Sequence, residues 1–457
     1  MRSQSLSINP ADGTLVGSYP AMDEAQLESA LDRASTGFRA WAGLPQASRT
    51  EHLRRLGAIL SLRREELARR ITLEMGKPIS LALAEVNKCA NLCHWYSNHA
   101  ERLLANEVHD FGPDGAATIR FLPLGTILAV MPWNFPMWQV LRAAVPIMAA
   151  GNGLLLKHAD NVQGSAVALA DCFAAAEFPE GAFSVVNADR DAIKGLLRDA
   201  RIFGVSVTAG VAAGSALAAE AGRNLKKSLL ELGGSDPFIV LADADLDRTV
   251  TQAIVARFQN CGQVCIAAKR FIVHDAIFDE FVGRFIERAR QIKVGDPMDP
   301  ATEMGPMARE SLRDEVHALV MQSLPQGARI VLGGEMPNGP GSYYPPTVLV
   351  DVTNDMSVCR EEVFGPVAPF LRARNADHAV ELANDSNFGL SASLWTANVS
   401  DAAGISRRIE AGAVYINGIS VSDPRVPIGG VKASGYGREL SHFGLKEFCN
   451  AQLQWIR

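Results

Sequence analysis

Two cysteines, Cys261 and Cys265, stand four positions apart in the stretch "FQNCGQVCIAAKR" (258–270), with no acidic residue beside them. A cysteine thiolate is a strong nucleophile, and it needs a neighbouring base or a positive environment to form. Buried cysteines are also common as small apolar side chains on helices, where they are inert. The stretch alone leaves both interpretations open, so the groups that would activate a thiol have to come from elsewhere in the chain.

Two other residues have the chemistry that a cysteine nucleophile requires. Glu231 lies in "LLELGGSDP" (229–237), between apolar residues and a Gly-Gly turn, where loss of hydration would raise its pKa and make it a candidate general base. Asn134 lies in "MPWNFPMWQVLR" (131–142), where a strand ends and a helix begins, and its amide could donate to an oxyanion. The alternatives are an exposed loop glutamate and an asparagine that caps a turn or helix.

Three further patterns concern binding. Trp138 and Arg142 are four residues apart, so they share one face of the helix that follows Asn134. Gly210 and Gly214 in "VTAGVAAG" open another helix after a strand, and they either allow close helix packing or offer the helix N-terminus to a phosphate. The dinucleotide fingerprint G-x-G-x-x-G is absent.

No metal site is expected. Cys89, Cys93, His94 and His99 fall close together, but they have helical spacing and no second ligand cluster. Structural zinc usually takes its ligands from two paired clusters, so a helix face explains these residues better.

The elements that must position these residues are short apolar runs separated by helical stretches. Such alternation is typical of a parallel sheet with both faces covered, and it predicts a doubly wound α/β region. The predicted strands are 126–131, 154–158, 182–187, 202–208 and 237–241, and the predicted helices are 137–150, 161–177, 190–200 and 211–224. The alternation resumes after residue 245, with strands at 270–274, 328–334, 393–396 and 412–418, and implies a second α/β domain. The segments 117–125 and 449–457 are predicted to be extended, as an edge strand or an oligomer contact.

Composition limits the partners. The chain has 457 residues, of which 48% are hydrophobic and 21% charged, and a net charge of -6, which argues against nucleic acid as a main partner. The most hydrophobic region, 125–156, is interrupted by Pro, Asn and Arg, so no membrane span is expected. The polar N-terminus has no apolar stretch of the signal-peptide kind, and we therefore expect a cytoplasmic protein whose seven cysteines are thiols.

Four motifs, taken in order, carry a resemblance to a known family. "PWNFP", "LELGG", "GQVC" and "EEVFGPV" resemble the aldehyde dehydrogenase superfamily, and the resemblance extends from residue 9 to residue 448. It implies an aldehyde dehydrogenase-like fold with two doubly wound α/β domains and a small β oligomerisation element. The cofactor domain of that family is a variant Rossmann fold without the glycine fingerprint. The implied division is 1–116 and 126–235 for the cofactor domain, 236–430 for the catalytic domain, and 117–125 with 431–457 as bridging segments of a homodimer or dimer of dimers.

The resemblance also implies roles for single residues. Cys265 matches the family's nucleophile, Glu231 its general base and Asn134 its oxyanion donor, whereas Cys261 falls on a position without a general role. NAD is the expected cofactor, with NADP possible, because Asp160 could accept hydrogen bonds from a ribose 2'-hydroxyl. The residues that the resemblance assigns to cofactor binding are Trp133, Lys157, Asp160, Thr208, Gly210, Gly214, Leu232, Glu362 and Phe364.

For the substrate, the runs "AGNGLLLKHADNVQG" (150–164) and "SHFGLKEFCN" (441–450) are most similar to those of bacterial succinate semialdehyde dehydrogenases. Arg142 falls where those enzymes hold a distal carboxylate, and Ser422 and Trp138 are assigned to the same pocket. An Arg142 that is instead paired with an acid is the alternative interpretation. The arginine that some of these enzymes carry six residues before the nucleophile is Gln259 here. The competing functions are oxidation of other aliphatic aldehydes, and a thiol esterase or structural relative whose cofactor binding is weakened by Ala209 and Gly210.

Overall fold

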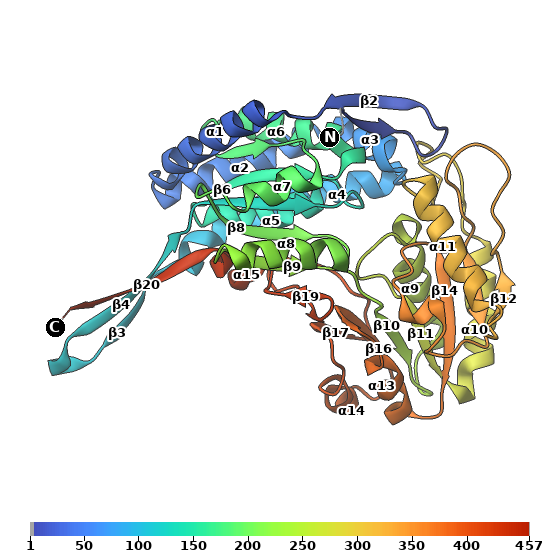
Figure 1. Cartoon of the computed structure of the whole chain (residues 1–457). Helices are drawn as coiled ribbons and strands as arrows, with labels where there is room; N and C mark the ends of the chain where they lie inside the picture. Colours follow the sequence, from blue (N-terminus) through green and yellow to red (C-terminus); the bar gives the residue numbers. More distant parts are fainter. Residues whose placement is uncertain (1–3, 457) are drawn as a thin grey trace.

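The computed structural model describes residues 4–456. Two sheet-based regions lie side by side, and a group of three strands extends away from them (Figure 1). The predicted α/β class and the alternation of strands and helices are confirmed.

The first region is built on a six-stranded sheet in the order β19-β9-β8-β5-β6-β7. Its first five strands in the chain are parallel to their neighbours, and β19 closes one edge antiparallel to β9. The strands are β5 (Thr126–Met131), β6 (Gly153–His158), β7 (Phe183–Val185), β8 (Ile202–Thr208), β9 (Lys227–Glu231) and β19 (Gly435–Tyr436). The sequence did not predict β9, which carries Glu231.

Helices cover both faces of this sheet. In β6, Leu154 and Leu156 pack with the larger core beside α2, α4, α5 and α6, whereas Leu155 points to the opposite face with α1, α7 and α8. Because side chains alternate along a strand, an uninterrupted apolar run can serve both faces. The helices are α1 (Glu24–Ala42), α2 (Gln46–Leu62), α3 (Arg64–Met75), α4 (Ile79–Leu103), α5 (Trp138–Ala149), α6 (Gln163–Ala175), α7 (Arg190–Leu196) and α8 (Val211–Arg223).

The second region has a seven-stranded sheet in the order β12-β13-β14-β11-β10-β16-β17. Its strands are β10 (Pro237–Val240), β11 (Arg270–His274), β12 (Arg329–Leu332), β13 (Thr347–Val350), β14 (Val367–Ala373), β16 (Ser391–Trp395) and β17 (Ala413–Ile416). Its helices are α9 (Leu246–Phe258), α10 (Phe278–Arg290), α11 (Glu310–Ser323), α12 (Ser357–Arg360), α13 (Ala376–Asn384) and α14 (Val399–Ser406). Only β12 runs antiparallel to its neighbour, and β13 and β14 were not predicted.

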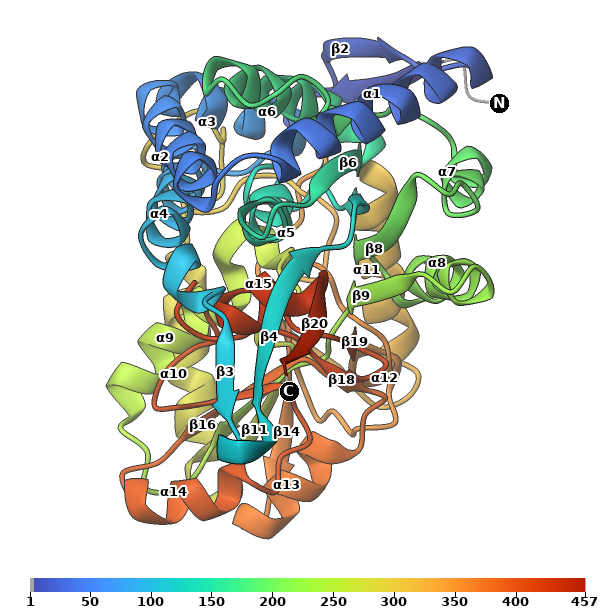
Figure 2. The ribbon, with the colours of Figure 1, turned by 90° about the vertical axis from the view of Figure 1, so that its left-hand side faces the viewer.

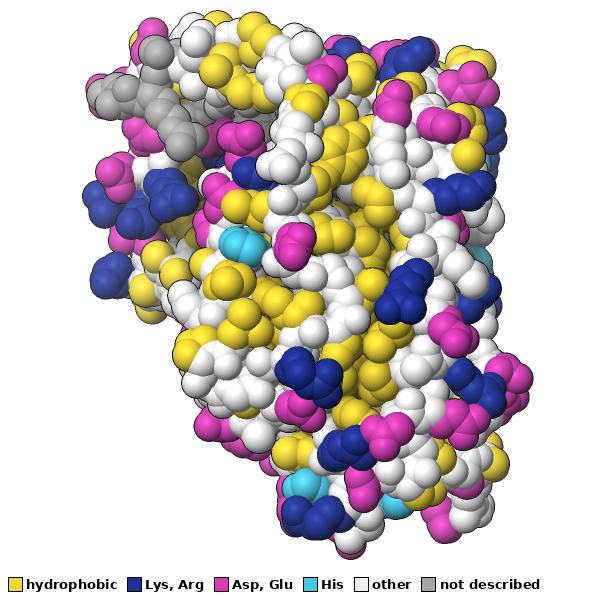
Figure 3. Space-filling view, turned by 90° about the vertical axis from the view of Figure 1, so that its right-hand side faces the viewer, with side chains coloured by type: hydrophobic (Ala, Val, Ile, Leu, Met, Phe, Trp, Pro, Cys, Tyr) yellow, Lys and Arg dark blue, Asp and Glu magenta, His cyan; other side chains and the backbone are white. Residues whose placement is uncertain are grey.

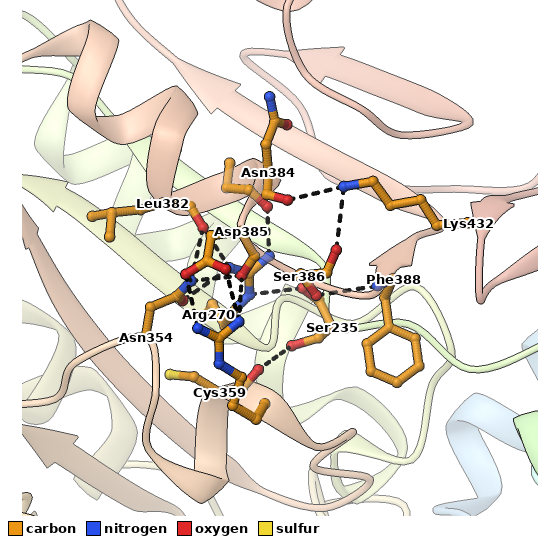
Figure 4. Close-up of polar contacts among 12 residues, drawn as sticks. Ser235, Arg270, Asn354, Cys359, Leu382, Asn384, Asp385, Ser386, Phe388 and Lys432 are labelled. Carbon is orange, nitrogen blue, oxygen red and sulfur yellow. Dashed lines mark hydrogen bonds and ion pairs between the residues drawn. The ribbon is translucent and has the colours of Figure 1, made fainter.

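The chain crosses between the two sheets just after Glu231, and the crossing is fixed by buried polar contacts (Figure 4). The buried guanidinium of Arg270 donates from Nε to the carbonyl of Ser235 (2.9 Å), from Nη1 to that of Leu382 (2.7 Å) and from Nη2 to that of Ala383 (2.8 Å). A charged donor shared among backbone carbonyls ties the crossing to α13 and β11. The segment that follows Glu231 is therefore held on both sides.

The two extended segments pair with each other in a three-stranded sheet of order β20-β4-β3, which projects from the body in Figure 1 and lies in front of it in Figure 2. Its strands are β3 (Glu107–Asp110), β4 (Ala116–Pro123) and β20 (Cys449–Ile456). Cys449 lies opposite Pro123 and Ile456 opposite Ala116. The sheet begins with β3, inside the segment assigned above to the cofactor domain.

Smaller elements complete the fold. A hairpin of β1 (Gln4–Ile8) and β2 (Leu15–Pro20) covers one end of the first region, β15 (Phe388–Gly389) pairs with β18 (Val431–Lys432), and α15 (Ser441–Glu447) precedes β20. Cys89 and Cys93 are buried on α4. Within residues 4–456, no group of three His, Cys, Asp or Glu side chains is placed to hold a metal ion.

The surface of the second region carries charges of both signs. In Figure 3, Lys and Arg side chains alternate with Asp and Glu, and hydrophobic side chains lie between them. Across the described part of the chain, no helix combines the length and apolarity needed to cross a bilayer.

Candidate active site

The helix that precedes the two cysteines ends before either of them. Helix α9 ends at Phe258, and Asn260 (φ 53°) and Cys261 (φ 57°) adopt the left-handed conformation. Such backbone is unfavourable for residues with a Cβ and persists only where the surroundings fix it. Here the buried Arg257 guanidinium donates to the carbonyls of Gly262 (2.8 Å) and Ala268 (2.9 Å). Cys265 therefore lies in a rigid loop, and the two cysteines are not neighbours on one helix face.

The two cysteines differ in exposure. The side chain of Cys261 is 1% exposed, and burial raises its pKa to about 12. Cys265 is partly exposed and lies where two cavities meet, since it lines both of them together with Gln139. Of the two, only Cys265 can reach a small molecule.

Asn134 follows β5 and its side chain is directed at the loop of Cys265. Its Nδ2 donates to the carbonyl of Gln263 at 3.1 Å, and its own carbonyl accepts from Asn260 Nδ2 at 2.9 Å. Both the side chain and the main chain of Asn134 are thus fixed against the cysteine loop. The left-handed Asn260 is needed for this arrangement, and no sequence pattern pointed to it.

Glu231 is the last residue of β9 and is buried, not an exposed loop residue. Burial raises its pKa to about 8, the nearby Arg142 opposes that rise, and the Glu439 carboxylate adds to it. The Arg142 Nη2 lies 3.9 Å from Glu231 Oε2, and Arg142 Nε is in direct contact with Glu439. A carboxyl group that titrates near neutral pH is suited to general-base chemistry.

The thiol of Cys265 is protonated at neutral pH in this environment. Burial raises its pKa, and the cations of Arg142 and Lys269 only partly offset that effect. Lys269 Nζ donates to the carbonyl of Cys265 (2.6 Å) and to Glu362 Oε1 (2.7 Å), which holds the loop in place. Forming the thiolate therefore needs a base, and Glu231 lines one of the cavities that Cys265 lines.

One of the two cavities, here called the cofactor-side cavity, lies at the C-terminal ends of β5, β8 and β9. Ligands of open α/β sheets bind at such strand ends. Trp133 and Phe364 meet edge to face across it, with ring centroids 5.7 Å apart. The predicted site residues that line it are Trp133, Asn134, Thr208, Gly210, Glu231, Leu232, Cys265, Glu362 and Phe364.

Three predicted cofactor residues lie outside this lining. Lys157, at the end of β6, pairs with Asp160 across 2.9 Å between Nζ and Oδ1. A Cβ on Gly214 would come within 2.3 Å of Leu232 Cδ2, so Gly214 allows α8 to pack closely against the segment after β9. Gly210, by contrast, is the N-cap of α8, and a Cβ there would meet nothing within 4 Å. The sequence left close packing and phosphate binding open as roles for these glycines. Gly214 allows close packing, and Gly210 leaves space at a helix N-terminus.

The other cavity, here called the substrate-side cavity, is lined by the three residues that the sequence assigned to substrate, Trp138, Arg142 and Ser422. Trp138 and Arg142 are both buried on α5, with the shared face that their spacing predicted. Ser422 follows β17 and accepts a hydrogen bond from Lys88 Nζ at 2.7 Å. The structure thus places the predicted substrate residues together, beside Cys265.

Comparisons with known proteins identify the family. Residues 2–453 match the model of the aldehyde dehydrogenase family. The chain belongs to the aldehyde dehydrogenase family. It is 52% identical to the succinate semialdehyde dehydrogenase [NAD(P)+] Sad of Escherichia coli (strain K12) over 453 residues, which cover 99% of this chain and 98% of that protein.

Other proteins named as succinate semialdehyde dehydrogenases are also similar to this chain. A succinate-semialdehyde dehydrogenase [NADP(+)] of Mycobacterium avium (strain 104) is 47% identical, with 98% of this chain and 96% of that protein covered. The crystal structure of succinic semialdehyde dehydrogenase from Streptococcus pyogenes in complex with NADP+ superposes with a TM-score of 0.97 at 34% identity, covering 99% of each chain. The predicted family and fold are therefore confirmed.

Three residues of this aldehyde dehydrogenase site were not found by sequence reasoning. Glu439 contacts Arg142, Lys269 holds the Cys265 carbonyl, and Lys88 reaches the substrate-side cavity from α4. Glu439 lies inside the range 9–448 over which the chain resembles the family, but none of the four motifs includes it. Lys88 lies inside an ordinary amphipathic helix, where nothing distinguishes it from a solvent-facing lysine.

Proposed function

We propose that this aldehyde dehydrogenase oxidises succinate semialdehyde, or a similarly short aldehyde with a distal carboxylate, to the acid with NAD+ or NADP+. The observation that carries the proposal is the position of Cys265 at the junction of two cavities, one bounded by strand ends and Glu231, the other by cationic side chains. The names of the similar proteins from Escherichia coli and Mycobacterium avium support the same substrate.

Cys265 is the proposed nucleophile. Its sulfur forms a bond to the aldehyde carbon, while Glu231 takes up the thiol proton, directly or through water. The carbonyl oxygen becomes an oxyanion, and the Asn134 amide and the Cys265 backbone N–H are the proposed donors to it. Each donor of an oxyanion hole contributes about 3 kcal/mol to the stabilisation of the transition state. The contacts of Asn134 with the cysteine loop mean that little reorganisation is needed.

The cofactor-side cavity fits a dinucleotide. Gly210 leaves open space at the N-terminus of α8 for a pyrophosphate, and Trp133, Thr208, Leu232, Glu362 and Phe364 provide a wall that leads to Cys265. Gly214 contributes by allowing α8 to approach Leu232. When bound there, NAD(P)+ supplies the acceptor for the hydride that leaves the substrate carbon.

Lys157 and Asp160 are the proposed partners of the adenine ribose, and their ion pair bears on the choice of cofactor. Asp160 favours a ribose 2'-hydroxyl and repels a 2'-phosphate, whereas the adjacent Lys157 attracts the phosphate. We therefore propose that NAD+ is preferred and NADP+ is accepted.

The second half of the reaction releases the acid. Oxidation leaves the substrate as a thioester on Cys265. Glu231 releases the thiol proton to solvent and, ionised again, removes a proton from the water that attacks the thioester carbon. The carbon–sulfur bond breaks, and Cys265 leaves as a thiolate. A carboxyl group with a pKa of about 8 can both accept and return protons at physiological pH, as these two steps require.

Steady-state rates with succinate semialdehyde and with butanal, an uncharged aldehyde of the same chain length, test the proposal with each cofactor. We expect the highest kcat/KM with succinate semialdehyde and NAD+. Equal kcat/KM values for both aldehydes would instead indicate a general aliphatic aldehyde dehydrogenase. Absence of saturable nicotinamide cofactor binding together with hydrolysis of an ester would indicate the thiol esterase.

We also propose a homodimer or dimer of dimers in the cytoplasm, with the division into domains given in the sequence analysis except that β3 joins the bridging segments. The projecting sheet supports the assembly, since the exposed fractions of Leu453 (58%), Trp455 (49%) and Ile456 (64%) are high for such side chains. Light scattering after gel filtration tests it, and a monomer at micromolar concentration would contradict it.

A further inference from the structure

The cationic side chains around the substrate-side cavity are not equivalent, because two of the three already have carboxylate partners. Lys77 is buried in direct contact with Glu85. Arg142 is in direct contact with Glu439 and lies 3.9 Å from Glu231. A buried charge that is already paired offers little net attraction to another anion. Neither group provides the cavity with a surplus positive charge.

Lys88 differs from both. Among residues 4–456 no carboxylate oxygen lies within 4.0 Å of its ammonium group. That group donates to Ser422 Oγ at 2.7 Å and lies over the face of the Trp138 ring, 4.0 Å from the centroid. Its side chain is partly buried and reaches the cavity from α4, while Ser422 comes from the loop after β17 and Trp138 from α5. Three elements therefore converge on one uncompensated cation.

We propose that Lys88 binds the distal carboxylate of the substrate, with Ser422 as its partner and the Trp138 ring as the support that positions its ammonium group. This inference rests on the proposed function. It assigns the charge recognition to Lys88, where the sequence assigned it to Arg142.

The donor geometry is consistent with this role. An ammonium group has three N–H donors, and only one is used by Ser422. The Ser422 oxygen accepts that hydrogen bond, which leaves its O–H to donate elsewhere. Lys88 and Ser422 can therefore each donate to one carboxylate. Since the position six residues before Cys265 is the neutral Gln259, Lys88 alone gives the cavity one positive charge to match one substrate carboxylate.

The electrostatics of Lys88 give a second, independent readout. Burial and, to a smaller extent, Arg142 lower the pKa of Lys88 to about 8, while Cys89, Glu85 and Asp423 oppose the shift. Of these, Glu85 is bound to Lys77, and Asp423 pairs with Arg425 at 2.7 Å. The ammonium group is mostly charged at pH 7 and loses its charge as the pH rises through 8. Recognition of a carboxylate by Lys88 must weaken over that interval.

The test compares succinate semialdehyde with butanal in the full-length wild-type enzyme and in Lys88→Met, Lys88→Arg and Lys194→Met. Methionine keeps an unbranched stem against Trp138 but removes the charge, and arginine restores it. Lys194, on α7, is a matched lysine outside the site. We expect Lys88→Met to lower the ratio of kcat/KM for succinate semialdehyde to that for butanal by about 10- to 100-fold, the usual effect of losing a charged hydrogen-bonding partner, mainly through KM. Lys88→Arg should recover part of the ratio, and Lys194→Met should not change it.

The outcomes separate this inference from the proposed function. A wild-type enzyme that does not prefer succinate semialdehyde would refute the proposed function. A wild-type enzyme that prefers it, with the ratio unchanged in Lys88→Met, would refute the role of Lys88. The same ratio should fall above pH 8 in the wild type and be independent of pH between 7 and 9 in Lys88→Met. Residual butanal oxidation shows that Lys88→Met folds. If that variant is inactive, the pH dependence of the kcat/KM ratio in the wild type tests the role of Lys88 by itself.

Discussion

Replacing Glu439 with glutamine would test whether the buried charges around Arg142 set the basicity of Glu231. At neutral pH, Arg142 is paired with Glu439, and Glu231 is mostly protonated because burial and the Glu439 carboxylate raise its pKa to about 8. Glu439→Gln removes the competing anion and leaves Glu231 as the charged partner of Arg142. The variant should therefore hold Glu231 ionised at lower pH.

The size of the effect follows from the spacing of the charges. At 3.9 Å, the Arg142–Glu231 pair attracts by about 4 kcal/mol at an effective dielectric constant near 20, so it dominates once Glu439 is neutral. Glu231 and Glu439 both lie against the Arg142 guanidinium, and two like charges ~7 Å apart repel by about 2 kcal/mol under the same assumption. Since 1.36 kcal/mol corresponds to one pKa unit, losing that repulsion should lower the pKa of Glu231 by about 1 to 2.

The assay is the pH dependence of kcat/KM with butanal, which avoids any contribution from carboxylate recognition. In the wild type, the rate should rise with pH with a midpoint near 8, and in Glu439→Gln the midpoint should lie near 6 to 7. Glu447→Gln is the matched control, because Glu447 lies on α15, in the same C-terminal segment, and pairs with Lys227 at 3.2 Å away from the site. A midpoint in Glu439→Gln that is unchanged, or higher than in the wild type, would refute the electrostatic reasoning.

Two more outcomes follow from the described contacts. Cys265→Ala should abolish aldehyde oxidation, whereas Cys261→Ala should keep most of it, because the Cys261 side chain is only 1% exposed. Steady-state rates of both variants test this, and the reverse result would overturn the choice of nucleophile. Gly214→Ala should lower the melting temperature, since its Cβ would meet Leu232 Cδ2 at 2.3 Å and overpacking costs about 1–3 kcal/mol. Gly210→Ala should melt close to the wild type but raise the KM for the cofactor, and a larger loss of stability at Gly210 would contradict the packing argument.

Two of the missed strands, β9 and β14, lack the uninterrupted apolar run that made the strand at 126–131 predictable. The run at 126–131 is continuously apolar, and it became β5 with the predicted bounds. In β9, by contrast, Lys227 and Ser228 precede the apolar residues, because that end of the strand is less buried. Strand β14 contains Pro369, which normally argues against a strand in the middle of a sheet, yet it lies between β13 and β11.

The site divides in a similar way. Asn134, Glu231 and Cys265 were found because their chemistry is unusual in their local sequence and because their motifs resemble a family. Lys88 and Glu439 were missed because their significance lies in partners from distant parts of the chain, Ser422 and Arg142. Local sequence gives the type of a side chain and its burial pattern, but which buried charges neutralise each other is decided by tertiary packing.

The late position of β19 in the chain determines when the first sheet is completed during synthesis. It closes the edge of the first sheet beside Glu231, with Gly435 opposite Glu231 itself, yet the whole seven-stranded sheet is translated between β9 and β19. Until that segment emerges from the ribosome, Arg142 has no Glu439 to pair with, and the first sheet has an open edge. Cys265 is translated before Glu439, whose contact with Arg142 is proposed to tune Glu231. A growing chain therefore lacks part of the charge network around Arg142 and Glu231 until the late segment docks.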